Sequence, residues 1–261
     1  MNGVRPAVAA GCFYPADATE LAQTVDGLLA SARPPQTGGV LRALVVPHAG
    51  YAYSGAVAAT AFASIREGGR PLRVAVLGPS HFLPLRRIAV SGARAWRTPL
   101  GVVPVDPELR SDAVAAAAVV DDGPHLHDHA LEVELPFLQR RVGGELRVLP
   151  VAVGGEAAQT AAVVAALAPH ALVVVSSDLS HYLDDATTRK VDRRTAQAVV
   201  ALDDSAIGER DACGAHALRG LLAHARQAGW TCTLLDLRTS ADATGDCDRV
   251  VGYGAFALTA P

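Results

Sequence analysis

The chain has 261 residues, of which 50% are hydrophobic and 19% are charged, enough apolar side chain to bury a sizeable core and to exclude a disordered or fibrous protein. The formal net charge is −3 and the basic residues are scattered, which argues against a dedicated binder of nucleic acid or of anionic membranes. A chain of this length suits one α/β domain, so we expect residues 1–261 to form a single domain.

The sequence also indicates the compartment. No stretch approaches the roughly 20 uninterrupted apolar residues of a membrane-spanning helix, and the first residues lack the pattern of a secretory signal. The four cysteines form no CxxC pair and are too few for a secreted disulfide scaffold. We therefore expect a cytoplasmic protein with reduced thiols.

The first predicted element is a helix near the N-terminus. Asp17 and Glu20 have the spacing of a capping box, and Leu21, Val25 and Leu28 follow on one helical face. Prolines and glycines end this pattern before residue 40.

Short apolar runs then alternate with helical patterns along the chain. The runs typical of buried strands are residues 40–46, 73–77, 86–90, 146–153, 171–175, 231–237 and 250–258. The helical patterns are residues 56–65, 107–118, 130–140, 156–167, 187–202 and 214–228. This alternation predicts a layered α/β/α domain with a largely parallel or mixed central sheet.

Histidines follow three of the predicted strands. His48 comes directly after the strand at 40–46, His81 follows the strand at 73–77, and His181 follows the strand at 171–175. In open α/β sheets the ligand lies beyond the carboxyl ends of the strands, where these loops converge. A single histidine at such a position is usually an ordinary polar residue, but three at equivalent positions favour one shared site.

Imidazole is the commonest side-chain ligand of first-row transition metals, and two histidines with one anionic ligand leave coordination positions open for substrate and for oxygen or water. The anionic ligand is not obvious. The candidates are Asp178, the acidic residues of the segment 125–132 and the thiolate of Cys213, and sequence spacing does not choose among them.

Several motifs in chain order closely resemble those of the Memo family, whose bacterial members are called AmmeMemoRadiSam system protein B. They are Gly-Cys-Phe-Tyr-Pro at 11–15, Pro-His-Ala-Gly-Tyr at 47–51, Leu-Gly-Pro-Ser-His at 77–81, His-Ala-Leu-Glu at 129–132, Ser-Ser-Asp-Leu-Ser-His at 176–181, Cys-Gly at 213–214 and Gly-Tyr-Gly-Ala at 252–255. The resemblance thus covers essentially the whole chain.

The resemblance implies a fold similar to the class III extradiol dioxygenases of non-haem iron. It also implies a metal ion held by His48, His81 and Cys213, with Asp178 and His181 lining the same pocket. A cysteine stands where the dioxygenases use a carboxylate. Because a thiolate is softer than a carboxylate, Cu(I) and Zn(II) join Fe(II), the preferred ion, among the metals to expect, and simple cleavage of catechols becomes doubtful.

Asp178 and His181 are the expected catalytic pair. Residues three apart share one side of a helical turn, so both side chains would face the end of the strand. Beside a metal, His181 would act as general acid or base while Asp178 orients its ring or binds substrate. The alternative is an ordinary helix cap followed by a partly exposed histidine.

The segment 125–129 contains three histidines, of which we expect only His129 to approach the site, with His125 and His127 in solvent. Glu132 is either a hydrogen-bond acceptor behind the metal ligands or a favourable acid near a helix N-terminus. Tyr51 and Tyr53 are expected to wall a pocket for an aromatic or peptide substrate.

The expected function is therefore that of a metal-dependent oxidoreductase. Dioxygen and a peptide or small aromatic substrate would occupy the open coordination positions of the metal. The resemblance implies partners of the radical S-adenosylmethionine and AMMECR1 types, with the substrate a modified peptide or protein. Two alternatives remain: a non-enzymatic protein that binds metal or peptide, and a metallohydrolase, which needs an activated water but no dioxygen.

Overall fold

The computed structural model describes residues 3–66, 72–142 and 145–261. The strands are β1 (Val4–Arg5), β2 (Val40–Val46), β3 (Leu72–Gly78), β4 (Ile88–Val90), β5 (Ala95–Thr98), β6 (Gly101–Pro104), β7 (Val119–Val120), β8 (Leu146–Val153), β9 (Leu172–Ser176), β10 (His181–Leu183), β11 (Thr231–Thr239) and β12 (Val250–Ala260). The helices are α1 (Ala18–Ser31), α2 (Tyr51–Phe62), α3 (Pro107–Ala115), α4 (Leu135–Val142), α5 (Ala157–Leu167), α6 (Asp185–Val200), α7 (Ala215–Gln227) and α8 (Ala241–Thr244), and two 3₁₀ turns are η1 (Gly123–His125) and η2 (Asp204–Ala206).

A central mixed sheet organises the molecule. Its strand order is β10-β12-β2-β9-β3-β8-β4-β7, and β11 pairs with β12 as well. The four central strands β2, β9, β3 and β8 are parallel to one another, whereas β12 and β4 run antiparallel to them on either side. The predicted largely parallel or mixed sheet is thus confirmed.

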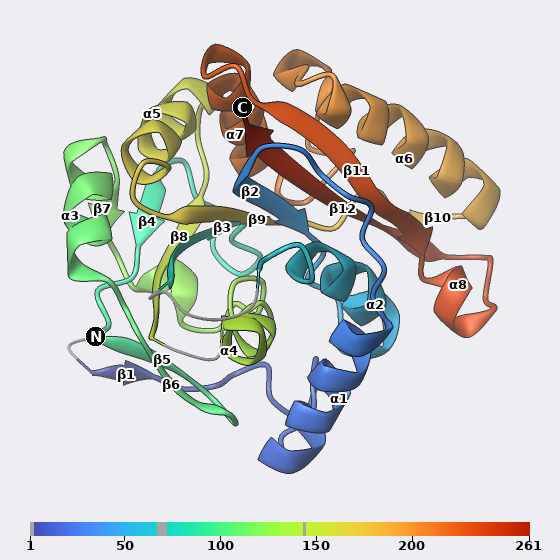
Figure 1. Ribbon diagram of the computed structural model, residues 1–261, viewed down its shortest axis with the longest axis horizontal. Helices are drawn as coiled ribbons and strands as arrows, with labels where there is room; N and C mark the ends of the chain where they lie inside the picture. The colour runs from blue at the N-terminus through green and yellow to red at the C-terminus, as the bar shows by residue number, and fades with distance from the viewer. Residues whose placement is uncertain (1–2, 67–71, 143–144) are drawn as a thin grey trace.

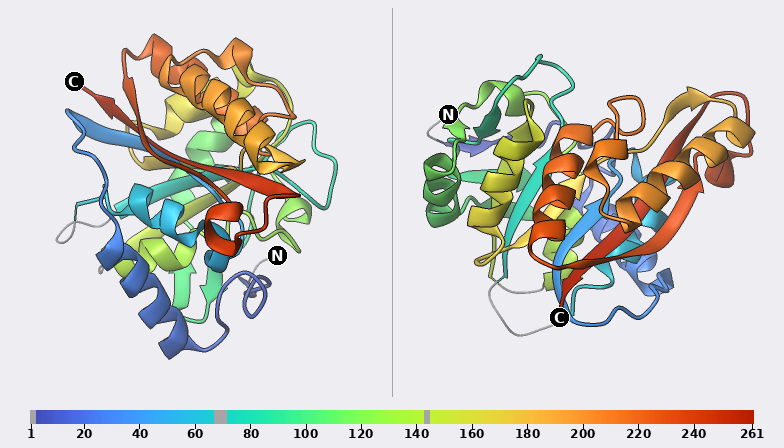
Figure 2. Two further views of the ribbon diagram at one scale, coloured as in Figure 1. Left: turned by 90° about the vertical axis from the view of Figure 1, so that its right-hand side faces the viewer. Right: turned by 90° about the horizontal axis from the view of Figure 1, so that it is seen from above.

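Helices cover both faces of this sheet (Figure 1). On one face α1 packs on α2 and α4, and on the other face α5 packs on α7, with α6 against β11 and β12. Seen from above, α5, α7 and α6 lie in front of the sheet (Figure 2). This arrangement is the α/β/α layering predicted from the sequence.

The central strands are buried because helices cover them on both sides. Val45, Val76 and Val174 are fully buried, and the buried apolar side chains form one cluster that includes residues from Ala9 to Leu258. In the described ranges, no helix is long and apolar enough to cross a membrane.

Each of the seven predicted strands lies within two residues of an observed strand, but two predicted helices are displaced. The helix predicted at 56–65 begins earlier, because α2 starts at Tyr51 directly after Gly50, the residue that caps it. The helix predicted at 130–140 begins later, at Leu135, since residues 130–134 form a turn. The strands β1, β5, β6, β7 and β10 were not predicted, because runs of two to four residues carry too little periodicity.

Candidate metal site

The carboxyl ends of three adjacent parallel strands bring the candidate ligands together. Val46 of β2 pairs with Ser176 of β9, and Leu77 of β3 pairs with Val175, so the three strands end almost level. The loops that follow carry His48, His81 and Asp178. The predicted convergence at this edge of the sheet is therefore observed.

Two glycines allow the loops to come this close. A Cβ at Gly78 would lie 2.8 Å from the Leu131 side chain, and a Cβ at Gly214 would lie 2.7 Å from Ser177 and 2.9 Å from the Ser176 carbonyl. Any larger residue would push the 129–132 turn or the Cys213 loop away from the strand ends.

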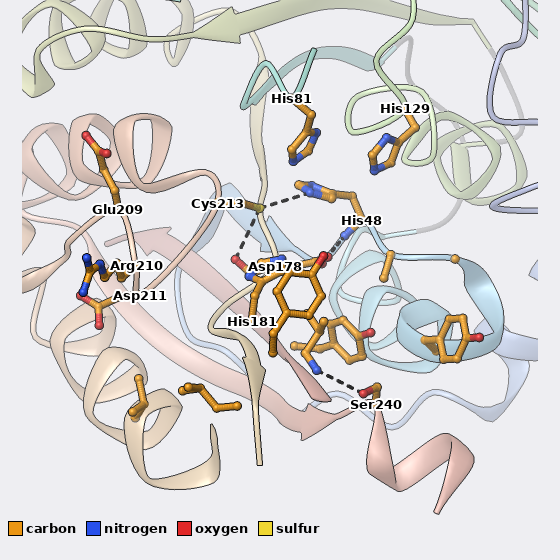
Figure 3. Close-up of a pocket in the computed structure, with 18 of the residues that line it drawn as sticks. His48, His81, His129, Asp178, His181, Glu209, Arg210, Asp211, Cys213 and Ser240 are labelled. Atoms are coloured by element: carbon orange, nitrogen blue, oxygen red, sulfur yellow. Dashed lines mark hydrogen bonds between the residues drawn. The ribbon is translucent and has the colours of Figure 1, made fainter. Parts of the chain in front are cut away.

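Three histidines form a cluster that is suited to a metal ion. The ring nitrogens available as ligands in His48, His81 and His129 all lie within 4.8 Å of one another. The rings of His48 and His81 meet edge to face, with centroids 5.2 Å apart, whereas those of His81 and His129 are stacked at 5.0 Å. Figure 3 shows the three rings close together beside Cys213.

His48 is held at both its backbone and its ring. Its N–H donates to Asp178 Oδ1 at 2.8 Å, and its Nδ1 lies 2.7 Å from Ser176 Oγ. Burial and the neighbouring His81 lower the pKa of His48 well below its usual value, so the ring is neutral. Its Nε2 is left facing the pocket, 3.2 Å from the Cys213 sulfur.

His81 is held by Asp128, which the sequence offered only as one of several candidate anionic ligands. Asp128 accepts from the His81 N–H at 2.5 Å and lies 3.2 Å from His81 Nδ1, and it also accepts from Ala130 N–H. Burial opposes ionisation, but these hydrogen bonds outweigh it and lower the pKa of Asp128 to about 2. An ionised carboxylate on Nδ1 leaves Nε2 of His81 for a metal.

His129 approaches the site as expected. Its ring stacks on Phe13, with centroids 3.8 Å apart, and on the other side faces His81. Burial and the nearby His81 lower the pKa of His129 to about 4, so this ring too is neutral near pH 7. It is therefore available as a third nitrogen ligand.

Cys213 lies beside the cluster, although the group of three ligand residues found among the described residues does not include it. Its sulfur contacts His48 Nε2, and its N–H donates to the Asp178 carbonyl at 3.2 Å. Burial and the nearby Asp178 raise the pKa of the Cys213 thiol to about 12. The thiol is thus protonated unless a cation displaces its proton.

Asp178 and His181 line the same pocket, but not from a helical turn as the spacing suggested. Residues 177–180 form an irregular loop, and His181 begins the short strand β10. The next residue, Tyr182, has φ 63°, a left-handed conformation that is uncommon for a side chain of this size. Burial raises the pKa of Asp178 to about 7 and lowers that of His181.

These side chains share one open cavity of about 1070 Å³ (Figure 3). The histidine cluster, Cys213 and Asp178 lie at one end of it, and Tyr53 and Tyr253 contribute to its wall. Glu209, Arg210 and Asp211, from the segment that precedes Cys213, line another side, and Arg194 of α6 also contributes to the lining. The cavity is wide enough for an aromatic group or a short peptide.

Other candidates lie outside the cavity lining. Tyr51 is buried, and its hydroxyl donates to the Val133 carbonyl. Glu132 is fully buried and accepts hydrogen bonds from Arg5, Tyr14 and the N–H groups of Val8 and Ala9. It therefore fastens the N-terminal segment to the turn that carries His129.

The expectation that His125 lies in solvent is wrong. Its ring is buried against Trp96, and its Nε2 lies 3.2 Å from the Ala89 carbonyl. Burial lowers the pKa of His125 to about 4. His127 is exposed, as expected.

Comparison with known proteins decides the family. Residues 5–257 match the family model described as Memo-like protein. The chain belongs to this family. It is 35% identical to a MEMO1 family protein of Methanopyrus kandleri over 96% of this chain and 97% of the relative. It is also 35% identical to one of Aquifex aeolicus with the same coverage, and 32% identical to one of Ignicoccus hospitalis over 99% of both chains.

Membership of the Memo-like family confirms the resemblance drawn from the motifs. All of those motifs lie inside the matched range 5–257, and the segments ending in His48, His81 and His181 meet at one pocket. The region that the family model covers is therefore the region that builds the histidine cluster.

Proposed function

We propose that the protein is a metal-dependent, dioxygenase-like oxidoreductase that uses one ion, preferably iron(II). The observation that supports this proposal best is the presence of three imidazoles and a thiol around one end of a cavity. Cu(I) and Zn(II) suit the same donors.

The donors fit a transition-metal ion. His48 and His81 each have Nδ1 engaged by a neighbouring side chain, so Nε2 is the nitrogen of each ring that could bind a metal. Cys213 is the third ligand that the resemblance implies, and His129 is the third ligand that the observed cluster favours. A redox-active ion here would supply one-electron chemistry with dioxygen that side chains lack.

His181 is the proposed acid or base, and Asp178 and Tyr53 support the site around it. His181 lines the cavity with a lowered pKa, so its neutral ring is ready to accept a proton from a substrate near the cluster. Asp178 fixes His48 through the backbone and holds the Cys213 loop through its own carbonyl. Tyr53 offers a half-exposed ring against which a substrate can pack.

The substrate that we propose is a peptide or protein side chain, or a small aromatic compound. The width of the cavity supports this substrate class. Partners of the radical S-adenosylmethionine and AMMECR1 types are proposed on the family resemblance alone, as is a cytoplasmic location.

Metal analysis of the anaerobically purified protein tests the site. Wild type and the variants His48→Ala, Cys213→Ala and His129→Ala would each be reconstituted with Fe(II), Cu(I) and Zn(II), with the exposed His127→Ala as matched control. We expect close to one equivalent in wild type and in the control, and loss in His48→Ala. Comparison of Cys213→Ala with His129→Ala identifies the third ligand. Full metal content in His48→Ala would refute the site.

Dioxygen consumption tests the catalytic part. We expect His181→Ala to keep its Fe(II) and to lose the consumption of dioxygen seen in wild type. If Fe(II)-loaded wild type consumes none with any peptide or aromatic probe, the alternative of a metal- or peptide-binding regulatory protein replaces the enzyme.

A further inference from the structure

A buried hydroxyl and a buried acid lie behind His48. Ser176 Oγ is 2.7 Å from His48 Nδ1, 2.7 Å from the Ala130 carbonyl and 2.9 Å from Glu134 Oε1. Both Ser176 and Glu134 are essentially without solvent contact. Neither residue lines the cavity, and neither was among the site residues predicted from the sequence.

Counting protons shows how these contacts can all be satisfied. Ser176 Oγ has one proton and two lone pairs. The Ala130 carbonyl can only accept, so the Ser176 proton must point to it. The two remaining neighbours, His48 Nδ1 and Glu134 Oε1, must then both donate to Ser176 Oγ.

This arrangement determines the state of both donors. Nδ1 of His48 carries the ring proton, and Nε2 presents its lone pair to the cavity. Glu134 is a neutral carboxylic acid with its proton on Oε1. Complete burial independently raises the pKa of Glu134 well above its usual value, in agreement with the hydrogen-bond count.

We propose that Ser176 and Glu134 are positioning residues that fix the tautomer of His48. Glu134 donates its proton to Ser176 Oγ and so keeps the Ser176 hydroxyl turned towards the Ala130 carbonyl, with a lone pair left to accept from His48 Nδ1. The proposal deepens the proposed metal function and rests on it for its purpose, because only the Nδ1–H tautomer offers Nε2 as a ligand. The tautomer itself can be measured without any metal.

The two ligand histidines are consequently held in different ways. An ionised carboxylate, Asp128, contacts His81, whereas His48 contacts a hydroxyl that is supported by a neutral acid. A neutral partner donates less electron density to the ring than a carboxylate does, so His48 is the less basic of the two ligands.

Nitrogen NMR of the metal-free protein tests the tautomer. Long-range ¹H–¹⁵N correlations of ¹⁵N-histidine-labelled protein distinguish Nδ1–H from Nε2–H rings, and the spectrum of His48→Gln assigns the His48 signals. We expect the Nδ1–H form in wild type and in Glu134→Gln, whose amide can also donate to Ser176. In Ser176→Ala and Glu134→Leu we expect a mixture of tautomers.

Metal affinity gives the second readout, with Co(II) as a spectroscopic probe. We expect Ser176→Ala and Glu134→Leu to weaken Co(II) binding roughly 10- to 100-fold, as is typical when a partner of a metal-bound histidine is lost, and Glu134→Gln to stay within about threefold of wild type. Circular dichroism confirms that each variant is folded.

Three results would overturn the proposal: a wild-type His48 in the Nε2–H form, an altered tautomer in the folded Glu134→Gln protein, or an unchanged tautomer and affinity in Glu134→Leu. If the protein has no metal site at this cluster, the experiments would give a different pattern. In that case His48→Ala would bind Co(II) as wild type does, while the tautomer pattern across the Glu134 and Ser176 variants would still follow the expectation.

Discussion

Asp128 shows how much one side chain contributes to the geometry of the cluster. It binds the backbone and ring of His81 and also caps the turn at Ala130. Because a single carboxylate holds both His81 and the turn that follows His129, its loss disturbs two members of the cluster together.

The first prediction concerns this residue. Asp128→Asn should weaken Zn(II) binding roughly 10- to 100-fold, because an amide cannot accept from the His81 N–H and ring as a carboxylate does. Competition titration against a chromogenic chelator measures the change. Asp26→Asn, which removes an exposed partner of Arg140, is the control and should bind as wild type. Equal affinity in both variants would argue against the role of Asp128.

The second prediction concerns the thiols. Burial raises the pKa of both Cys213 and Cys232 to about 12, whereas Cys12 and Cys247 are exposed. Since the thiolate is the nucleophile, iodoacetamide at pH 8 should label Cys12 and Cys247 first and leave Cys213 largely unmodified in metal-free protein. Peptide mass spectrometry follows the order. Rapid labelling of Cys213 would show that its proton is easily lost.

Among individual residues, the sequence predicted those that directly follow strands and missed those that hold them in place. His48, His81 and His181 could be found because parallel strands end at a common edge. Ser176 also ends a strand, but a serine there carries no chemical signal by itself. Asp128 and Glu134 lie outside the strands and helices, and only the folded backbone shows which way their side chains point.

Among the elements, the N-terminal strand β1 has the least expected role. Arg5 is fully buried, packs on the Trp96 ring at 3.9 Å and donates to Glu132 and to the carbonyls of His125 and Asp128. The small sheet β1-β5-β6 is thereby fastened to the turn that carries Asp128 and His129. The strand was too short to be predicted, although it determines where that turn lies.

The third prediction follows from this contact. Arg5→Ala leaves Glu132 as an uncompensated buried charge, so we expect the free energy of unfolding to fall by about 3–5 kcal/mol. Arg140→Ala removes only an exposed ion pair and should cost at most about 1 kcal/mol. Guanidinium denaturation of both variants measures the difference. Similar losses in the two would contradict a special role for Arg5.

For the molecule as a whole, the layers and most of the sheet were predictable because the central strands are long apolar runs separated by helical patterns. The mixed character of the sheet arises at its margins, where β12 and β4 run antiparallel, and direction is not encoded in apolar periodicity. The cavity depends on the joint placement of loops from distant parts of the chain, so its shape could not be predicted.

The fourth prediction concerns stability against acid. The pKa of His125 is about 4 in the folded protein and about 6.5 when unfolded, so the unfolded chain binds the proton more readily. Neutral His125 therefore contributes to the free energy of unfolding fully above pH 6.5. This contribution is lost as the pH falls towards 4, a change of about 3 kcal/mol. Denaturation of wild type and His125→Gln at pH 7 and pH 4 measures it, because the variant lacks this titration. A constant difference between the two proteins would refute the prediction.

The last strand of the chain, β12, lies inside the sheet between β2 and β11, and its residues Val251 and Tyr253 line the cavity. Both β10 and β11 pair with this strand, and β12 joins them to β2 and the rest of the sheet. The pairing of β12 with β2 brings Phe256 opposite Val45, two residues that are very far apart along the chain. Contacts of such large sequence separation form slowly, so we expect the cavity wall to take shape late in folding.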